Sequence, residues 1–216
     1  MASFFERLTN ETKEEKSYLQ SAPIIQKALK GEISKEAYIS YLTQAYYHVK
    51  HTTPLLMLVG SKVSHDKEWV RDAIAKYIEE EVGHQEWILN DIKNCGGDEE
   101  KVRNGRSNMA TELMVAYAYD SVSRINPLSF FGMVFVLEGT STALATQAGE
   151  AIMKSLNLPK NCFSYLFSHG SLDISHMKFF AELVNKFDDE KDKADIIHMA
   201  KIMFQLFGNM FRSIEN

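Results

Sequence analysis

The stretch SHGSLDISHMKFF, which spans Ser168–Phe180, places His169, Asp173 and His176 at helical spacing. Residues three, four and seven positions apart lie on one face of an α-helix, so these three side chains form a single stripe. Aromatic and aliphatic residues on both sides of the stripe indicate that part of the helix is buried. Removing three polar groups from water together is costly unless each has a strong partner. The stripe therefore predicts a metal site, with a set of hydrogen-bonded core side chains as the alternative.

Length and composition predict one globular, all-α domain over residues 1–216. The chain has 216 residues, of which 45% are hydrophobic, and this is enough for one substantial core. Four prolines, eleven glycines and long runs of helical periodicity favour helices over strands. The net charge of −5 and the mixed charge pattern give no indication of a nucleic-acid partner.

No segment predicts export or membrane insertion. The opening residues are too charged for a secretory signal, and the most apolar run, Ser129–Leu137, is about half the length that a membrane-spanning helix needs. Cys95 and Cys162 form no CxxC motif and indicate no disulfide framework. We therefore expect a cytoplasmic protein that does not associate with a membrane.

The periodicity predicts seven helices. Thr12-x-x-Glu15 has the form of a capping box before the first helix, and Pro23 should break that helix near Tyr18–Ser21. A kink is expected before Pro54 in the second helix. The expected ranges are Thr12–Lys30, Ser34–Val59, Asp66–Asn94, Asn108–Arg124, Asn126–Asn157, Lys160–Phe187 and Asp189–Ile214.

The third predicted helix carries a second metal-capable pair. Glu81 lies three residues before His84, so a carboxylate and an imidazole would share one helix face. An ExxH pair of this kind is also used by ferritin-like di-iron bundles. The alternative is a solvated acidic face, because Glu79–Glu81 form a run of like charges.

Glu138 lies in FFGMVFVLEGTSTALA, the most apolar part of the chain. A carboxylate in such a setting has to be paired, protonated or bound to a metal, or has to lie at a rim. Gly83, Gly139 and Gly170 each adjoin one of the suspected ligands, and a glycine inside a helix costs ~1 kcal/mol relative to alanine. Close approach of helices around a small site would explain them.

Together these motifs supply three carboxylates and three imidazoles from three predicted helices. Oxygen and imidazole ligands without thiolates favour iron or manganese over structural zinc. Six such ligands suffice for two metal ions with positions left open for O₂ or substrate. The candidate ligands are Glu81, His84, Glu138, His169, Asp173 and His176.

With these residues, the chain resembles the haem-oxygenase-like fold, in the branch of haem-oxygenase-like di-iron oxidases or iron-containing redox enzymes. The TenA thiaminases and the PqqC cofactor-synthesis oxidases share this scaffold. The resemblance covers nearly the whole chain and includes Lys30–Val49, the EEEVGH segment, the LEGTS segment at Leu137–Ser141 and the closing HxxxDxxH motif.

The resemblance implies metal ligation by His84, Glu138, His169, Asp173 and His176, and the ExxH form adds Glu81. Some relatives take the first carboxylate from seven residues before the histidine, where this chain has Tyr77. Others add a glutamate from the second helix, where this chain has Tyr47 and His48. Tyr47, His48, Tyr77 and Thr142 are expected to orient the imidazoles or to line the pocket.

The function implied is that of a non-haem di-iron, O₂-dependent oxidase or oxygenase acting on a small organic substrate. Two iron ions are the expected cofactor, with manganese as an alternative metal, and a homodimer is left open. One alternative is a metal-free TenA/PqqC-type enzyme of thiamine or PQQ metabolism. Another is a non-enzymatic helical module that binds a ligand or a partner. Haem oxygenase chemistry would need an early axial histidine, and no histidine precedes His48.

Overall fold

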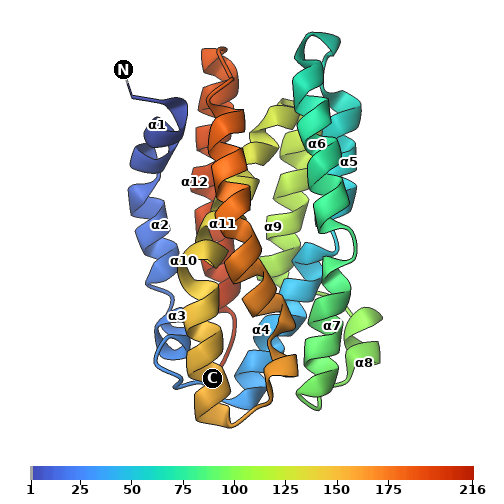
Figure 1. The fold of residues 1–216 in the computed structure, drawn as a ribbon, viewed down its shortest axis with the longest axis vertical. Helices are drawn as coiled ribbons and strands as arrows, with labels where there is room; N and C mark the ends of the chain where they lie inside the picture. The colour runs from blue at the N-terminus through green and yellow to red at the C-terminus, as the bar shows by residue number, and fades with distance from the viewer. Residues whose placement is uncertain (1) are drawn as a thin grey trace.

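The computed structural model describes residues 2–216, apart from the side chains of residues 171–174. The described chain consists of helices joined by turns, and most of the long helices run along the long axis of an elongated bundle (Figure 1). The all-α class is therefore confirmed. Several of the seven predicted helices are, however, divided into shorter ones. The helices are α1 Phe4–Glu11, α2 Lys13–Gln20, α3 Pro23–Ala28, α4 Lys35–Val49, α5 Thr52–Lys62, α6 Glu68–Glu81, α7 His84–Asn94, α8 Glu99–Arg103, α9 Met109–Asp120, α10 Phe130–Leu156, α11 Ser164–Val184 and α12 Glu190–Arg212.

The N-terminal region begins its first helix earlier than the sequence predicted. Ser3 and Glu6 form the capping box, because the Ser3 hydroxyl accepts from the Glu6 amide at 3.2 Å and Glu6 accepts from the Ser3 amide at 2.8 Å. The capping box predicted at Thr12 is wrong, since the Thr12 hydroxyl donates to the Leu8 carbonyl at 2.8 Å. The break predicted before Pro23 is confirmed, as α2 ends at Gln20 and α3 begins at Pro23.

The second predicted helix is two helices, α4 and α5. Ser34 caps α4 by accepting from the Ala37 amide at 3.0 Å, and α4 ends at Val49. The interruption falls at Lys50 and His51, so Pro54 lies in the first turn of α5. Amides in the first turn of a helix have no intrahelical acceptor, and the missing N–H of proline therefore costs little there.

The third predicted helix is also interrupted, between α6 and α7. Val82 is extended, and Gly83 has a φ of 92°, a conformation that glycine adopts at little cost. Nothing lies within 4 Å of a Cβ placed on Gly83, so its backbone conformation, rather than close helix packing, explains this glycine. As a result, Glu81 is the last residue of α6 and His84 is the first of α7.

Helix α10 packs along both α11 and α12 and buries most of its first two turns. A Cβ on Gly170 of α11 would collide with the Thr146 hydroxyl and lie 3.2 Å from the Thr146 amide nitrogen. The close approach predicted for Gly170 is therefore confirmed. Nothing lies within 4 Å of a Cβ on Gly139, so the same prediction is wrong there.

The segment Pro127–Leu156 is long and apolar enough, by length and composition, to cross a membrane. However, 67% of its most apolar window is buried inside the protein. Burial of this kind is what a central core helix requires.

A buried carboxylate joins α7 to the start of α11. Asp91 accepts hydrogen bonds from the Ser164 amide at 3.0 Å, from the Ser164 hydroxyl at 2.5 Å and from the Tyr165 amide at 2.8 Å. These amides are among those that a helix start leaves unpaired, and a negative charge is favourable there. Asp91 thereby fixes α11, and the histidines on it, relative to α7.

We predict that Asp91→Ala lowers the free energy of unfolding by about 2 kcal/mol, because it leaves buried donors of α11 without an acceptor. Urea unfolding followed by circular dichroism would measure the change. Asp98→Ala is the matched control, since Asp98 caps the exposed helix α8 through the Lys101 amide at 2.9 Å. The control should lose about 1 kcal/mol or less. Equal losses in the two variants would contradict a special role for Asp91.

Candidate metal centre

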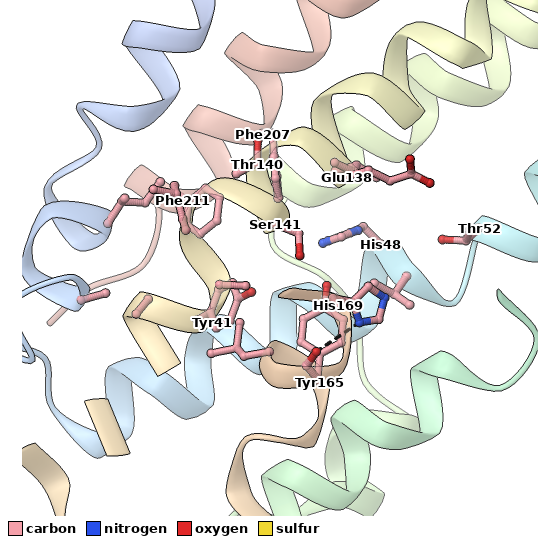
Figure 2. A pocket seen from close by; sticks show the side chains of 18 of the residues that line it. Tyr41, His48, Thr52, Glu138, Thr140, Ser141, Tyr165, His169, Phe207 and Phe211 are labelled. Atoms are coloured by element: carbon pink, nitrogen blue, oxygen red, sulfur yellow. Dashed lines mark hydrogen bonds between the residues drawn. The ribbon is translucent and has the colours of Figure 1, made fainter. Parts of the chain in front are cut away.

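A cavity of about 150 Å³ runs through the bundle between α3, α4, α10 and α11. Five of the residues that line it were named in the sequence analysis as candidate ligands or as their expected neighbours. These are His48, Tyr77, Glu81, Glu138 and His169. Figure 2 shows the part of the cavity where His48, Ser141 and His169 approach one another from three helices. The described lining residues include no lysine and no arginine.

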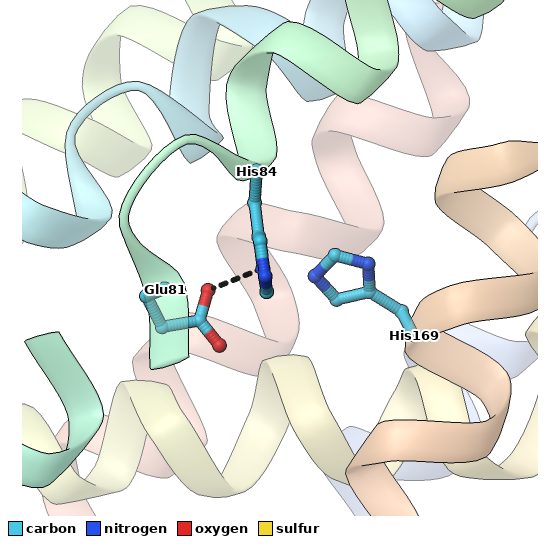
Figure 3. Close-up of side chains that lie close together, drawn as sticks. All are labelled: Glu81, His84 and His169. Carbon is cyan, nitrogen blue, oxygen red and sulfur yellow. Dashed lines mark ion pairs between the residues drawn. The ribbon is translucent and has the colours of Figure 1, made fainter. Parts of the chain in front are cut away.

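Three of the predicted ligands meet at one end of this cavity. One ligand atom from each of Glu81, His84 and His169 lies within 4.8 Å of the other two (Figure 3). His84 Nδ1 is 3.1 Å from Glu81 Oε2. The break at Gly83 is responsible for this pair, because Glu81 and His84 belong to different helices and do not share a helix face as the sequence predicted.

His176 brings a second group of side chains to the same place. Its Nδ1 lies 3.7 Å from Glu138 Oε1 and 4.0 Å from Glu81 Oε1. Its Nε2 lies 3.3 Å from Glu80 Oε2. The structure thus gathers Glu81, His84, Glu138, His169 and His176, while the Asp173 side chain lies outside the described residues.

Glu81 is placed between the two groups. One of its carboxylate oxygens faces His84, and the other faces His176. Burial by itself would raise the pKa of Glu81, but the hydrogen bond to His84 and the favourable electrostatic interactions with His84, His169 and His176 outweigh it and hold the pKa below its usual value. The carboxylate is therefore ionised at neutral pH, the form in which it binds metals.

A contact with the backbone of its own helix fixes the tautomer of His169. His169 Nδ1 lies 3.1 Å from the Tyr165 carbonyl, which can only accept, so Nδ1 carries the proton. The lone pair then belongs to Nε2, the nitrogen that would ligate a metal. The Tyr165 ring also packs against His169, with ring centroids 4.5 Å apart.

Trp87 is a site residue that the sequence reasoning missed. Its ring stacks on His84 with centroids 4.0 Å apart and meets the edge of His169 at 6.0 Å. Trp87 follows His84 by three residues, so helical spacing from a suspected ligand was the signal that could have found it. Glu80, which lies four residues before His84, was not among the predicted ligands, although its carboxylate approaches His176.

The four predicted neighbours divide into two pairs. Tyr77 packs edge-on against His176 with centroids 6.3 Å apart, and His48 lines the cavity. The Tyr47 hydroxyl instead donates to the Val102 carbonyl at 2.9 Å, and the Thr142 hydroxyl donates to the Glu138 carbonyl at 2.8 Å. These two hydroxyls thus bond to the backbone rather than to an imidazole.

Sequence comparison identifies the family of the chain. A family model described as iron-containing redox enzyme matches residues 39–208. The chain belongs to the iron-containing redox enzyme family. The match includes the helices that carry Glu81, His84, Glu138, His169 and His176. No curated protein sequence matches this member of the family.

Solved structures show that this family member has a haem-oxygenase-like fold. A domain of unknown function with that fold from Shewanella denitrificans superposes with a TM-score of 0.86 at 22% identity, over 99% of this chain and 92% of that one. A TenA homologue from Pseudomonas syringae gives a TM-score of 0.80 at 12% identity, over 98% and 91%. Haem oxygenase-1 from Synechocystis, in complex with haem, gives 0.77 at 13% identity, over 99% and 93%. At these identities the likeness is one of fold.

We predict that Trp87→Leu weakens the binding of Fe(II) about tenfold, because His84 loses the ring that fixes its orientation. Anaerobic competition with a chelator would measure the affinity. Trp69→Leu is the control, since Trp69 packs on Phe187 with centroids 5.0 Å apart and touches none of the clustered histidines in the described contacts. An unchanged affinity in Trp87→Leu, or an equal loss in the control, would contradict this role.

Proposed function

We propose that this family member is a non-haem iron enzyme that uses two iron ions and O₂ to oxidise or oxygenate a small organic molecule. The observation that carries the proposal is the buried cluster of glutamates and histidines, drawn from α6, α7, α10 and α11, at one end of a largely apolar cavity. Family membership supports iron. Manganese remains the alternative, because it takes the same oxygen and imidazole ligands.

The residues present fit such a centre. His84, Glu138 and His176 are only 4%, 9% and 6% exposed, so each needs a strong partner in place of water. Oxygen and nitrogen donors without a thiolate suit iron or manganese. Glu81, His84 and His169 would hold one ion, and Glu138 and His176 would hold the second. One carboxylate oxygen of Glu81 faces His84, and the other faces His176.

Bound iron would supply the electrons and the open coordination positions for reaction with O₂. The chain contributes the remaining requirements. The ionised Glu81 keeps a negative charge between the imidazoles, and the Tyr165 carbonyl holds the proton of His169 on Nδ1. The apolar walls of the cavity exclude bulk water from an organic substrate placed beside the cluster.

A TenA-type reaction with a cysteine nucleophile is less well supported. Both cysteines are buried, and neither is among the described residues that line the cavity. Burial, with a contribution from Cys162, raises the pKa of the Cys95 thiol to about 12. A thiol in such a state is a poor nucleophile at neutral pH. A purely structural binding module would leave the burial of so many titratable groups without a purpose.

We predict that the full-length protein, produced with iron, binds two iron ions per chain and that His169→Ala and His176→Ala each retain one or none. Metal analysis of the purified proteins would give the stoichiometry, and thermal unfolding would show that the variants are folded. His198→Ala is the control, because His198 is exposed on α12. Full iron content in both site variants would refute the proposed ligand set.

We further predict that the Fe(II)-loaded protein consumes O₂ in a single turnover, whereas Glu81→Gln does so at least tenfold more slowly. The neutral amide keeps the size of Glu81 but removes the charge that faces both imidazoles. An oxygen electrode and stopped-flow absorbance would follow the reaction. Iron binding without O₂ consumption would indicate metal storage or sensing in place of oxidation.

A further inference from the structure

The cavity extends far beyond the metal cluster. Its lining residues on α10 run from Phe130 to Ile152, which corresponds to about 33 Å of helix axis. Glu138 lies nearer to the Phe130 end, so the longer arm of the cavity points from the cluster towards α3. A volume of about 150 Å³ over such a length makes a narrow slot.

The longer arm is apolar. On α10 it is lined by Leu144, Ala148 and Ile152, and on α3 by Ile24 and Ile25. Side chains of this kind favour a narrow hydrocarbon, since each buried CH₂ group contributes to binding and each buried polar group is penalised.

Two polar atoms lie where this arm meets the cluster. His48 Nδ1 and Ser141 Oγ are buried and have no hydrogen-bond partner among the residues that the structure describes. Both residues line the cavity, and Figure 2 shows them extending from α4 and α10 into the same space beside His169. His48 is only 3% exposed, and its ring packs edge-on against Phe207 with centroids 5.5 Å apart. Buried polar atoms rarely lack partners, so these two indicate a place for a ligand group.

The charges around this place restrict what the group can be. His48 is only 3% exposed, and a neutral imidazole offers one donor and one acceptor. Glu81 and Glu138 line the same end of the cavity, while its described lining has no lysine or arginine. In the metal-free protein, an anionic group would therefore meet carboxylates without a cationic side chain to balance it.

We propose that the cavity binds a molecule with a long, unbranched apolar tail and an uncharged hydrogen-bonding group, as in a long-chain primary alcohol, aldehyde or amide, and that His48 and Ser141 bind this group. The inference deepens the proposed function. It rests on that function only in taking the bound molecule to be the substrate. Binding itself needs only the cavity and the two polar side chains.

Isothermal titration of the full-length protein with 1-decanol, 1-butanol and decanoate would test the preference, with the protein Fe(II)-loaded under anaerobic conditions and again after chelation. In both forms 1-decanol should bind at least 100-fold more tightly than 1-butanol, because the apolar arm takes the longer tail. After chelation, 1-decanol should also bind at least tenfold more tightly than decanoate. Tighter binding of decanoate to the chelated protein, or no effect of tail length in either form, would overturn the proposal.

Substitutions locate the binding site. His48→Phe keeps a ring of similar size and should weaken 1-decanol at least tenfold, Ser141→Ala should weaken it severalfold, and Ala148→Phe should remove the preference for the longer tail. His51→Phe and Thr142→Ala are matched controls, since His51 bonds to Tyr119 and Thr142 to its own helix. Unchanged affinity in both His48→Phe and Ser141→Ala would overturn the assignment.

Three further results separate this inference from the proposed function. Loss of iron in His48→Phe would make His48 a metal ligand and would overturn its role as a ligand anchor. A protein that binds 1-decanol through His48 and Ser141 but holds no iron would support the binding site and contradict the oxidase. A protein that consumes O₂ but binds none of the three probes would support the oxidase and contradict the binding site.

Discussion

Glu81 holds one carboxylate oxygen 3.1 Å from His84 and the other 4.0 Å from His176, inside the bundle. A carboxylate in this position loses most of its hydration, and the loss is tolerable only because imidazoles approach it from two sides. Those imidazoles come from α7 and α11, so the same interaction that keeps Glu81 ionised also requires the two helices to converge. The remaining features of the site depend on this convergence.

Two residues set how the helices around the cluster converge. These are Asp91, which contacts the start of α11, and Gly83, which lies between α6 and α7. Asp91 caps α11 from α7 through three hydrogen bonds, which sets where His169 and His176 lie. Gly83 allows the chain to turn between α6 and α7, which brings Glu81 and His84 together although they end and begin different helices. Neither residue would ligate a metal. Both determine whether the candidate ligands can meet.

The cavity places the polar cluster beside an apolar arm in the interior of the bundle. The cluster occupies one region of the cavity, and apolar side chains of α3 and α10 line the longer arm. The proposed substrate would place its tail in that arm and its polar group beside the cluster. Because binding energy is then gained away from the reacting atoms, it can be used to orient them.

Sequence patterns were sufficient for the helical class and for most of the candidate ligands. Glu138 could be recognised because a carboxylate in a long apolar run needs a strong partner, and the histidines because their spacing matches a helix face. The same patterns failed at Lys50–His51 and at Val82–Gly83, where two predicted helices are interrupted. Hydrophobic periodicity continues through such breaks, because the core-facing side of a chain stays apolar when a helix changes direction.

The sequence by itself determined which chemical groups this protein can bring to a site: three imidazoles, several carboxylates and no well-placed thiolate. Only the tertiary structure decided how they meet. The stacking of Trp87 on His84, the position of Glu81 between two imidazoles, and the narrow cavity beside His48 all arise from contacts between helices far apart in the chain. Such contacts depend on crossing positions and local breaks, and these are set by the packing of the whole core rather than by any one segment.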